Sequence, residues 1–376
     1  MSLAARAARG LGDVHRASKR YGRNPLHVAA RLATLFLEGG FRPADANRYG
    51  LSDPGLPRER LAGCVSKREL RPLQRMLSPL EHDFLVGDKA VFYLFCRALD
   101  LPIPRLLAIF DRPFGFRARG ELLQGRQDWQ TFLAGELPAE CVVKPARGSG
   151  GVGLRVLRRT GDGFRDEVSG ETFTTVGLYD ALDSPRRSRL VVQERLRSHE
   201  ELERLSGTPA LQTVRFNTLV GEDGVCRIGP ARLKVIVGDY LTDNLGSGRS
   251  GNLVAFIGEQ GALAGAAAFA ADGLGLTWVE RHPRTGARFE GFRIPFFAEA
   301  TALIRRVAPL FLPLRTVGWD VAITQHGPSL IEGNCHWDPP NYVVPRAGPR
   351  PWEAEMGAFL AAFRSEAARR RLHAAR

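Results

Sequence analysis

One stretch of the sequence, VVKPARGSGGVGLRV at residues 142–156, excludes two familiar nucleotide-binding loops. Its glycines match G-x-G-x-x-G, but that pattern needs a helix to begin at the loop, and here a short apolar segment and the turn TGDG follow. A P-loop would need Lys and then Ser or Thr where the chain has Leu154 and Arg155. We therefore expect a strand, a flexible glycine loop and a second strand. Lys144 ends the first strand, and the backbone amides of the glycine loop that follows can close over phosphates. The alternative is a plain β-hairpin that binds no phosphate.

The chain of 376 residues is long enough for two or three domains. The segment PLHVAARLATLFLEGG has apolar residues at helical spacing and ends at paired glycines, and a second helix is predicted from about Asp88 to Leu99. From residue 210 onward, strand patterns dominate. We expect a helical accessory segment over 1–80, an α/β unit over 81–124, a lobe with the glycine loop over 125–196, and a strand-rich lobe with a basic C-terminal helix over 197–376.

The net charge of +13 suggests an anionic partner, but its distribution argues against nucleic acid. Arginines are spread along the whole chain without interleaved aromatic residues, as a general preference for Arg over Lys would produce. The chain keeps only five lysines, and Lys89 and Lys144 are favoured among them as phosphate contacts.

The five cysteines are widely spaced and include no C-x-x-C pair, which predicts reduced thiols in a cytoplasmic protein. No apolar run approaches the length of a membrane span. The Arg-rich start resembles a transit segment but lacks the apolar core of a secretory signal, and we interpret it as a basic helix.

The segment VGWDVAITQHGPSLIEGN at residues 317–334 predicts an acidic hairpin with a turn at QHGP. A turn centred near His326 places Asp320 opposite Glu332, with Asn334 farther along the same face. Like charges that face each other destabilise a sheet, so a cation is expected between the two carboxylates. Hard oxygen donors without His or Cys favour Mg²⁺ or Mn²⁺. A solvated hairpin face with a chance acidic pair is the alternative.

Several segments together resemble one known family. A lysine before a glycine hairpin, followed much later by an acidic hairpin ending in E-x-N, is typical of the ATP-grasp superfamily. The segments QERLRSHEEL, TVRFNTL and HPRTGARFEGFRIPFFAEATALIRRVAPLF make the chain similar to the sugar-transfer-associated ATP-grasp family, from about Leu80 to Tyr342. The resemblance implies an α+β fold in which two α+β lobes clamp ATP, with a helical N-terminal segment added.

The resemblance also implies which residues contact the nucleotide. Lys89 and Lys144 resemble the two lysines that touch the phosphates. The loop from Arg147 to Gly151 resembles the mobile flap over them, with contacts from Ser149, Gly150 and Gly151. The adenine edge would be bound by Gln193, Glu194 and the backbone of Leu196, and His199 would reach the ribose or a phosphate unless it caps a helix.

The metal and catalytic positions follow in the same way. Asp320, Glu332 and Asn334 match the Mg²⁺ ligands of the superfamily. Arg215 resembles a phosphate or acyl-phosphate contact, and Arg232 is a looser candidate for the same work beside Lys144. His282 could act as a general base, although a turn-stabilising histidine is favoured, and His336 and Asp338 receive no role.

These assignments predict an ATP-dependent ligase that activates a small carboxylate as an acyl phosphate, which an amine or a hydroxyl then attacks. A kinase of the same fold, acting on a small or sugar-like acceptor, is the alternative. A basic polymer-binding protein with a structural nucleotide site is a third hypothesis. The sequence does not identify the carboxylate or its acceptor, and it leaves the oligomeric state open, a homodimer included.

Overall fold

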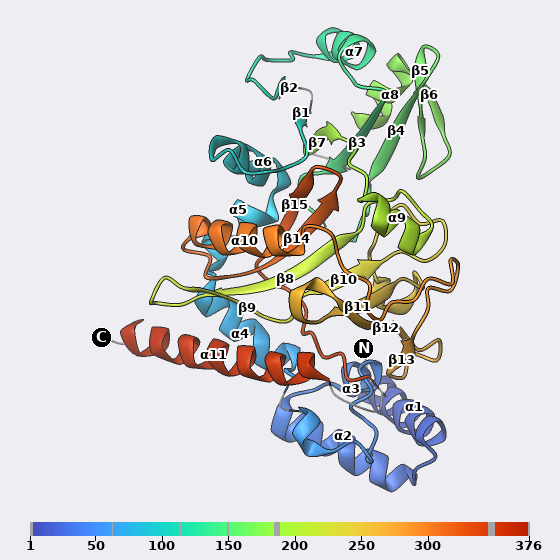
Figure 1. The fold of residues 1–376 in the computed structure, drawn as a ribbon, viewed down its shortest axis with the longest axis vertical. Coiled ribbons are helices and arrows are strands. Elements are labelled where there is room, and N and C mark those ends of the chain that lie inside the picture. The colour runs from blue at the N-terminus through green and yellow to red at the C-terminus, as the bar shows by residue number, and fades with distance from the viewer. Residues whose placement is uncertain are drawn as a thin grey trace.

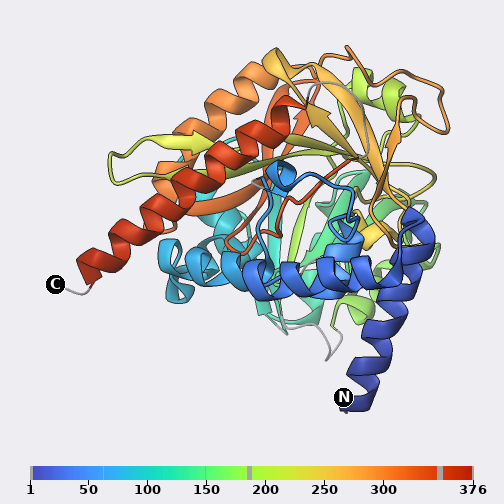
Figure 2. The ribbon, with the colours of Figure 1, turned by 90° about the horizontal axis from the view of Figure 1, so that it is seen from below.

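The computed structural model describes residues 3–61, 63–112, 114–148, 150–183, 189–344 and 350–374. The N-terminal segment is helical, as expected, and lies at one end of the molecule beneath the large sheet (Figures 1 and 2). Asn24 caps its second helix, which ends at Gly40 in the left-handed conformation, so the paired glycines end it as the sequence predicts. The helices are α1 (Leu3–Tyr21), α2 (Pro25–Gly39), α3 (Pro43–Arg48), η1 (Arg58–Leu61) and α4 (Lys67–Leu77).

A short helical connection leads from this segment into the first lobe. It comprises η2 (Leu80–His82), α5 (Phe84–Gly87) and α6 (Lys89–Ala98). Asp88 caps α6 by accepting hydrogen bonds from the backbone N–H groups of Ala90 and Val91. The cap fixes the start of the helix, and therefore the place of Lys89.

The first lobe is an antiparallel sheet with strand order β2-β1-β7-β3-β4-β5-β6. The glycine stretch joins β3 to β4, which pair antiparallel, so the predicted strand, loop and strand are confirmed. Two strands from the 81–124 segment belong to this same sheet. Its elements are β1 (Leu106–Asp111), β2 (Phe114–Arg117), α7 (Arg126–Gly135), β3 (Glu140–Pro145), β4 (Arg155–Thr160), β5 (Gly163–Asp166), β6 (Thr172–Thr174), α8 (Thr175–Leu182) and β7 (Arg189–Glu194).

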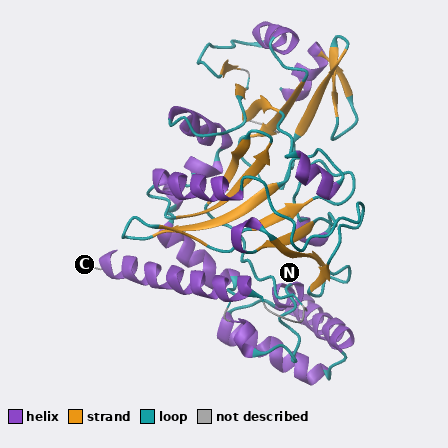
Figure 3. Cartoon of the chain, viewed as in Figure 1, coloured by secondary structure: helices purple, strands orange, loops and turns teal. Residues whose placement is uncertain are grey.

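The second lobe is a larger antiparallel sheet, whose strands are orange in Figure 3. Its strand order is β13-β12-β11-β10-β8-β14-β15, and β9 pairs with β8. The strands are β8 (Thr213–Val220), β9 (Cys226–Ile228), β10 (Arg232–Val235), β11 (Leu253–Ile257), β12 (Leu263–Phe269), β13 (Leu276–Val279), β14 (Thr316–Thr324) and β15 (Gly327–Asn334). The helices are α9 (Glu200–Ser206), η3 (Gly246–Gly248), η4 (Glu259–Gly261), α10 (Phe297–Val307), η5 (Ala308–Phe311) and α11 (Pro351–Ala374). The α+β class is thus confirmed.

Apolar packing holds the parts together. Side chains from α6, α10 and the large sheet share one buried core, while the first lobe has its own. The C-terminal helix α11 packs on α4 of the N-terminal segment around Trp337. No helix in the described part of the chain is long and apolar enough to cross a membrane.

The acidic hairpin forms with one correction. The turn is shorter than predicted, because Gly327 and Pro328 already pair with Thr324 and Ile323 in the strands. That register alone would place Asp320 opposite Ile331, but the register shifts between Asp320 and Val321, and Asp320 faces Glu332. The predicted pair is therefore correct, and the irregularity in β15 makes it so.

Candidate active site

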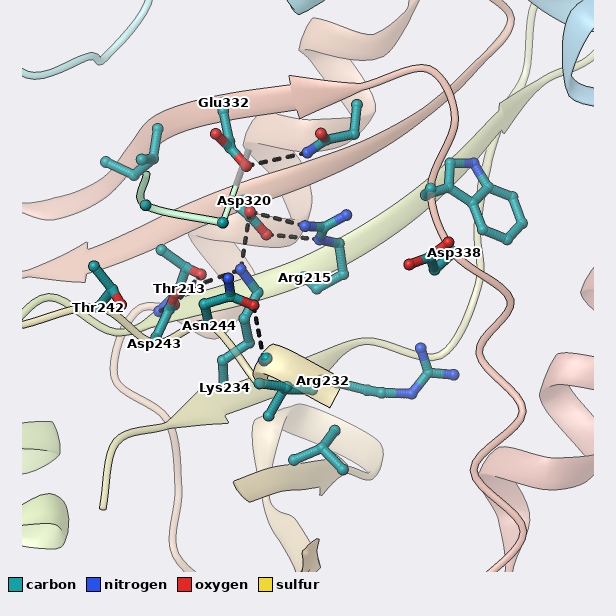
Figure 4. Close-up of a pocket in the computed structure, with 18 of the residues that line it drawn as sticks. Thr213, Arg215, Arg232, Lys234, Thr242, Asp243, Asn244, Asp320, Glu332 and Asp338 are labelled. Atoms are coloured by element: carbon teal, nitrogen blue, oxygen red, sulfur yellow. Dashed lines mark hydrogen bonds and ion pairs between the residues drawn. The ribbon is translucent and has the colours of Figure 1, made fainter. Parts of the chain in front are cut away.

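A cavity of about 700 Å³ lies between the two lobes. It brings together predicted residues that are far apart in the sequence, from the first lobe, the glycine loop and the large sheet (Figure 4). The predicted residues that line it are Lys89, Lys144, Gly150, Gly151, Arg215, Arg232, Asp320, Glu332 and Asn334.

Two lysines meet at the end of the cavity near the first lobe. The Nζ atom of Lys144 donates to the hydroxyl of Tyr93 at 2.7 Å, and that hydroxyl donates to the carbonyl of Ile331 at 2.7 Å. Lys89 lies one helical turn before Tyr93 on α6, and its Nζ donates to the carbonyl of Gly148 at 3.0 Å. Burial, with the nearby Lys89 charge, lowers the pKa of Lys144 to about 7. The two ammonium groups repel each other there, so a polyanion that pairs with both is favoured.

The strand register sets a row of side chains across the large sheet. Residues directly opposite each other share a face, so the row points into the same space. From β11 to β15 it runs through Phe256, Arg232, Arg215, Asp320 and Glu332. Two cations are thus followed by two anions, and all four charged residues line the cavity.

The cations beside Asp320 are protein side chains. Arg215 donates to both carboxylate oxygens of Asp320, at 2.6 and 2.9 Å, and the Nζ atom of Lys234 lies 2.9 Å from Oδ2. Burial by itself would raise the pKa of Asp320, but Arg215 and Lys234 outweigh it and hold that pKa well below its usual range. Arg215, which lies opposite Asp320 on the neighbouring strand, thus supplies positive charge beside it, and a bound cation between Asp320 and Glu332 stays a prediction.

The donor set for a divalent metal is made of oxygen atoms. Among the described residues, no group of three His, Cys, Asp or Glu side chains lies close enough to hold a metal ion by itself. Glu332 and Asn334 line the cavity together, and Asn334 donates a long 3.3 Å hydrogen bond to Glu332, which leaves its amide oxygen available. Asp320 accepts one hydrogen bond at Oδ1 and two at Oδ2, so its capacity for a further ligand is nearly used. The residues fit Mg²⁺ or Mn²⁺ held mainly by Glu332 and Asn334.

The glycine loop closes one side of the cavity against a second loop. Gly150 and Gly151 have φ angles of 72° and 74°, which side chains rarely adopt. A Cβ atom at Gly150 would lie 3.0 Å from the side chain of Asn244, and one at Gly151 would lie 3.1 Å from Thr242. The two lobes therefore approach each other closely at Gly150 and Gly151, and the lack of a side chain permits this approach as well as the turn. Ser149 lies outside the described residues.

Four predicted nucleotide contacts do not line this cavity. Glu194 at the end of β7 accepts from the backbone N–H of Arg105 at 2.7 Å, and the buried side-chain oxygen of Gln193 has no hydrogen-bond partner among the described residues. Leu196 follows β7. His199 caps α9 by accepting from the backbone N–H of Glu201, as the helix-cap alternative predicts. The adenine assignments remain predictions.

The histidine of the HPRTG segment has a structural place. His282 is buried, its Nε2 lies 2.9 Å from the carbonyl of Ile236, and its Nδ1 accepts from the backbone N–H groups of Arg284 and Thr285. Because both ring nitrogens are engaged by backbone groups, His282 stabilises the turn. His336 and Asp338, which the sequence left without a role, line the cavity.

The sequence missed several cavity residues. Lys234 lies between Asp320 and Asp243, and both carboxylates outweigh burial to raise its pKa. The scarcity of lysine could have indicated Lys234, because this Arg-rich chain has only five lysines and three of them line the cavity. Nothing in the sequence pointed to the contributions of the N-terminal segment, which are Arg48, Tyr49 and Arg71.

Among curated proteins, no sequence shows significant similarity to this chain. Similar solved structures include a D-alanine–D-alanine ligase from Bacillus anthracis, at 11% identity and a TM-score of 0.38, over 77% of this chain and 70% of that one. D-alanyl-alanine synthetase A from Vibrio cholerae matches at 14% identity and 0.42, over 76% and 66%. N5-carboxyaminoimidazole ribonucleotide synthetase from Thermotoga maritima matches at 11% and 0.33, over 73% and 49%. Similarity at this level says nothing about the reaction of this chain.

The family comparison is decisive. The model of the sugar-transfer associated ATP-grasp family matches residues 70–342, which is well over half of the chain. The matched range holds both sheets and every described residue of the predicted site. It confirms the resemblance carried by the lysines, the glycine loop and the E-x-N hairpin, and it implies that the chain binds ATP. This protein belongs to the sugar-transfer associated ATP-grasp family.

Proposed function

We propose that the protein is an ATP-dependent ligase that joins a small carboxylate to an amine through an acyl phosphate. One observation carries the proposal: Lys89, Lys144 and Glu332 lie at one end of the cavity. Arg215 lines the same cavity two strands away from Glu332 in the large sheet. Such a reaction needs charges that position and neutralise phosphate, and it needs no protein nucleophile.

The residues divide the work along the cavity. Lys89 and Lys144 would hold the terminal phosphates of ATP, and the glycine loop would cover them and exclude water. Mg²⁺ bound at Glu332 and Asn334 would neutralise charge on the phosphate oxygens. Arg215, held in place by Asp320, would orient the carboxylate that attacks the terminal phosphate, and would then stabilise the acyl phosphate until the amine displaces phosphate.

A kinase acting on a hydroxyl is the second candidate, and one residue favours it. Asp243 lines the cavity, and burial raises its pKa in spite of the neighbouring Lys234. A carboxylate with a raised pKa is suited to accept the proton of an attacking hydroxyl. Its hydrogen bonds from Thr213 and its ion pair with Lys234 suit a purely structural role equally well.

Hydroxylamine separates the two reactions. With ATP, Mg²⁺ and a panel of small carboxylates, a ligase forms a hydroxamate from the trapped acyl phosphate, whereas a kinase releases a stable phosphorylated acceptor. We expect hydroxamate formation that is lost in Glu332→Gln and kept in Asp162→Asn, which removes an exposed carboxylate outside the cavity. A phosphorylated acceptor without hydroxamate would establish the kinase. Full activity of Glu332→Gln would remove Glu332 from the site.

A further inference from the structure

Arg232 is a buried arginine with no anionic partner among the described residues. Its side chain is almost wholly inaccessible, its Nε atom has no hydrogen-bond partner, and none of the ion pairs found in the described chain includes it. Its guanidinium lies over the ring of Tyr342, 4.8 Å from the ring centroid. A void of about 10 Å³ beside it has room for about one water molecule, which could accept one N–H but would not balance the charge.

The position of Arg232 in the sheet adds to this cost. Arg215 lies directly opposite it on β8, and like charges directly opposite each other are destabilising. Arg215 turns to Asp320, whereas Arg232 extends away from that cluster (Figure 4). Burial lowers the pKa of Arg232 to about 10, so it still carries its charge at neutral pH. A buried charge that lacks a counter-ion and lies beside a like charge is unfavourable unless a ligand of opposite charge binds to it.

The N-terminal segment walls this end of the cavity. Tyr49, which follows α3, packs against Phe269 and Tyr342 with ring centroids 6.2 and 6.3 Å apart. Arg48 lines the same cavity, and no partner for its guanidinium is found in the described part of the chain. Two arginines and a group of aromatic rings thus surround one space, and α3 supplies part of it.

This space is separate from the phosphate end. Arg232 and Glu332 are three strands apart in the row, which is about 14 Å at the usual strand spacing of about 4.8 Å. If the terminal phosphate lies at the Glu332 end and the reacting carboxylate lies at Arg215, Arg232 is available to bind a more distant part of the substrate.

We propose that Arg232, with Arg48, binds a second anionic group of the substrate, a carboxylate or a phosphate that does not react. This proposal rests on the proposed function for the reacting carboxylate of the substrate and for the end of the cavity at which that carboxylate lies. The substrate would be a molecule with a reacting carboxylate at one end and a fixed negative charge at the other, and its body would contact Tyr49, Phe269 and Tyr342. The N-terminal segment is then part of the substrate site.

Calorimetric titration of the full chain, saturated with Mg²⁺ and ADP, tests the subsite. The anionic probes are glutarate and glucose 6-phosphate, and their neutral counterparts are glutaramide and glucose. We expect at least one anionic probe to bind the wild type and its neutral counterpart to bind far more weakly. Arg232→Met should weaken that binding roughly ten- to a hundredfold, since a charge-assisted pair is lost, and Arg232→Lys should recover part of it. Arg249→Met, at an exposed arginine of the same cavity, should change it little.

Thermal melting without ligand distinguishes a ligand site from a structural arginine. Arg232→Met should melt at or above the wild-type temperature because it removes an unpaired buried charge, whereas Arg215→Met should melt lower because Asp320 loses one of its two cationic partners. Binding of glutarate alone would assign a carboxylate, and binding of glucose 6-phosphate alone would assign a phosphate.

Three outcomes overturn the proposal: no preference of the wild type for an anion, equal binding by Arg232→Met, or melting of Arg232→Met as low as Arg215→Met. Because the readout is binding, a protein that forms a phosphorylated acceptor without hydroxamate but binds anions through Arg232 would refute the ligase and support this subsite.

Discussion

Replacing Asp320 by Asn should destabilise the large lobe far more than replacing Glu332 by Gln. Asp320 is buried and is the shared partner of Arg215 and Lys234. The side chain of Glu332 is 28% exposed, and its one ion pair within the described residues is with Lys89, at 3.5 Å. Removing one partner of a buried pair costs about 3–5 kcal/mol in free energy of unfolding, and losing a partly exposed pair costs about 0–1 kcal/mol. The cost of Asp320→Asn should fall toward the lower end, since Lys234 keeps Asp243.

Urea denaturation followed by tryptophan fluorescence measures this difference. Trp319 is buried on β14 directly before Asp320, so it reports on the same strand. We expect Asp320→Asn to lower the urea midpoint strongly without changing the slope, and Glu332→Gln to keep a midpoint near that of the wild type. Equal midpoints for the two variants would refute the conclusion that Asp320 is neutralised by Arg215 and Lys234.

Three further predictions concern the phosphate end. Because phosphates favour the charged form of Lys144, ATP affinity should fall as the pH rises above about 7. The protein without ligand should gain stability between about pH 7 and 10.5, because there the unfolded chain keeps the Lys144 proton and the folded chain has lost it. Calorimetry and thermal melting from pH 6 to 9 check both trends, and Lys144→Met should abolish them. Tyr93→Phe removes the acceptor of Lys144 and should weaken ADP binding by about tenfold in titration, with a wild-type constant contradicting the role of that hydroxyl. Gly150→Ala should reduce turnover much more than the melting temperature, because its φ angle of 72° and the 3.0 Å approach to Asn244 oppose closure of the loop; a turnover equal to that of the wild type would show that the contact is dispensable.

Local patterns were sufficient for much of the fold. Helix signals predicted α2 and α6, since caps and apolar spacing lie within one segment. The glycine stretch predicted the β3–β4 hairpin for the same reason. Sheet membership could not be predicted in this way: β1 pairs with β7, which is distant in the sequence, and β2 joins the same sheet by pairing with β1. Such pairing depends on long-range contacts that no local pattern contains.

The candidate site shows the same division. Asp320, Glu332 and Asn334 were predicted because one hairpin holds them all, although the turn was placed too broadly and the irregularity in β15 restored the pairing. Lys234 was missed, because its importance comes from Asp243 and Asp320 on other segments.

The sequence by itself determined the chemical groups of this protein: a glycine hairpin after Lys144, an acidic hairpin ending in Glu332 and Asn334, and a helix that begins at Lys89. Each is encoded within a few residues, where spacing and turn chemistry decide the outcome. Only the tertiary structure decided which charges neutralise one another, since the register of β10, β8 and β14 places Arg215 beside Asp320 and leaves Arg232 without an anionic partner among the described residues. Charge pairing depends on distances of a few ångströms between strands, and those distances exist only after the sheet has formed.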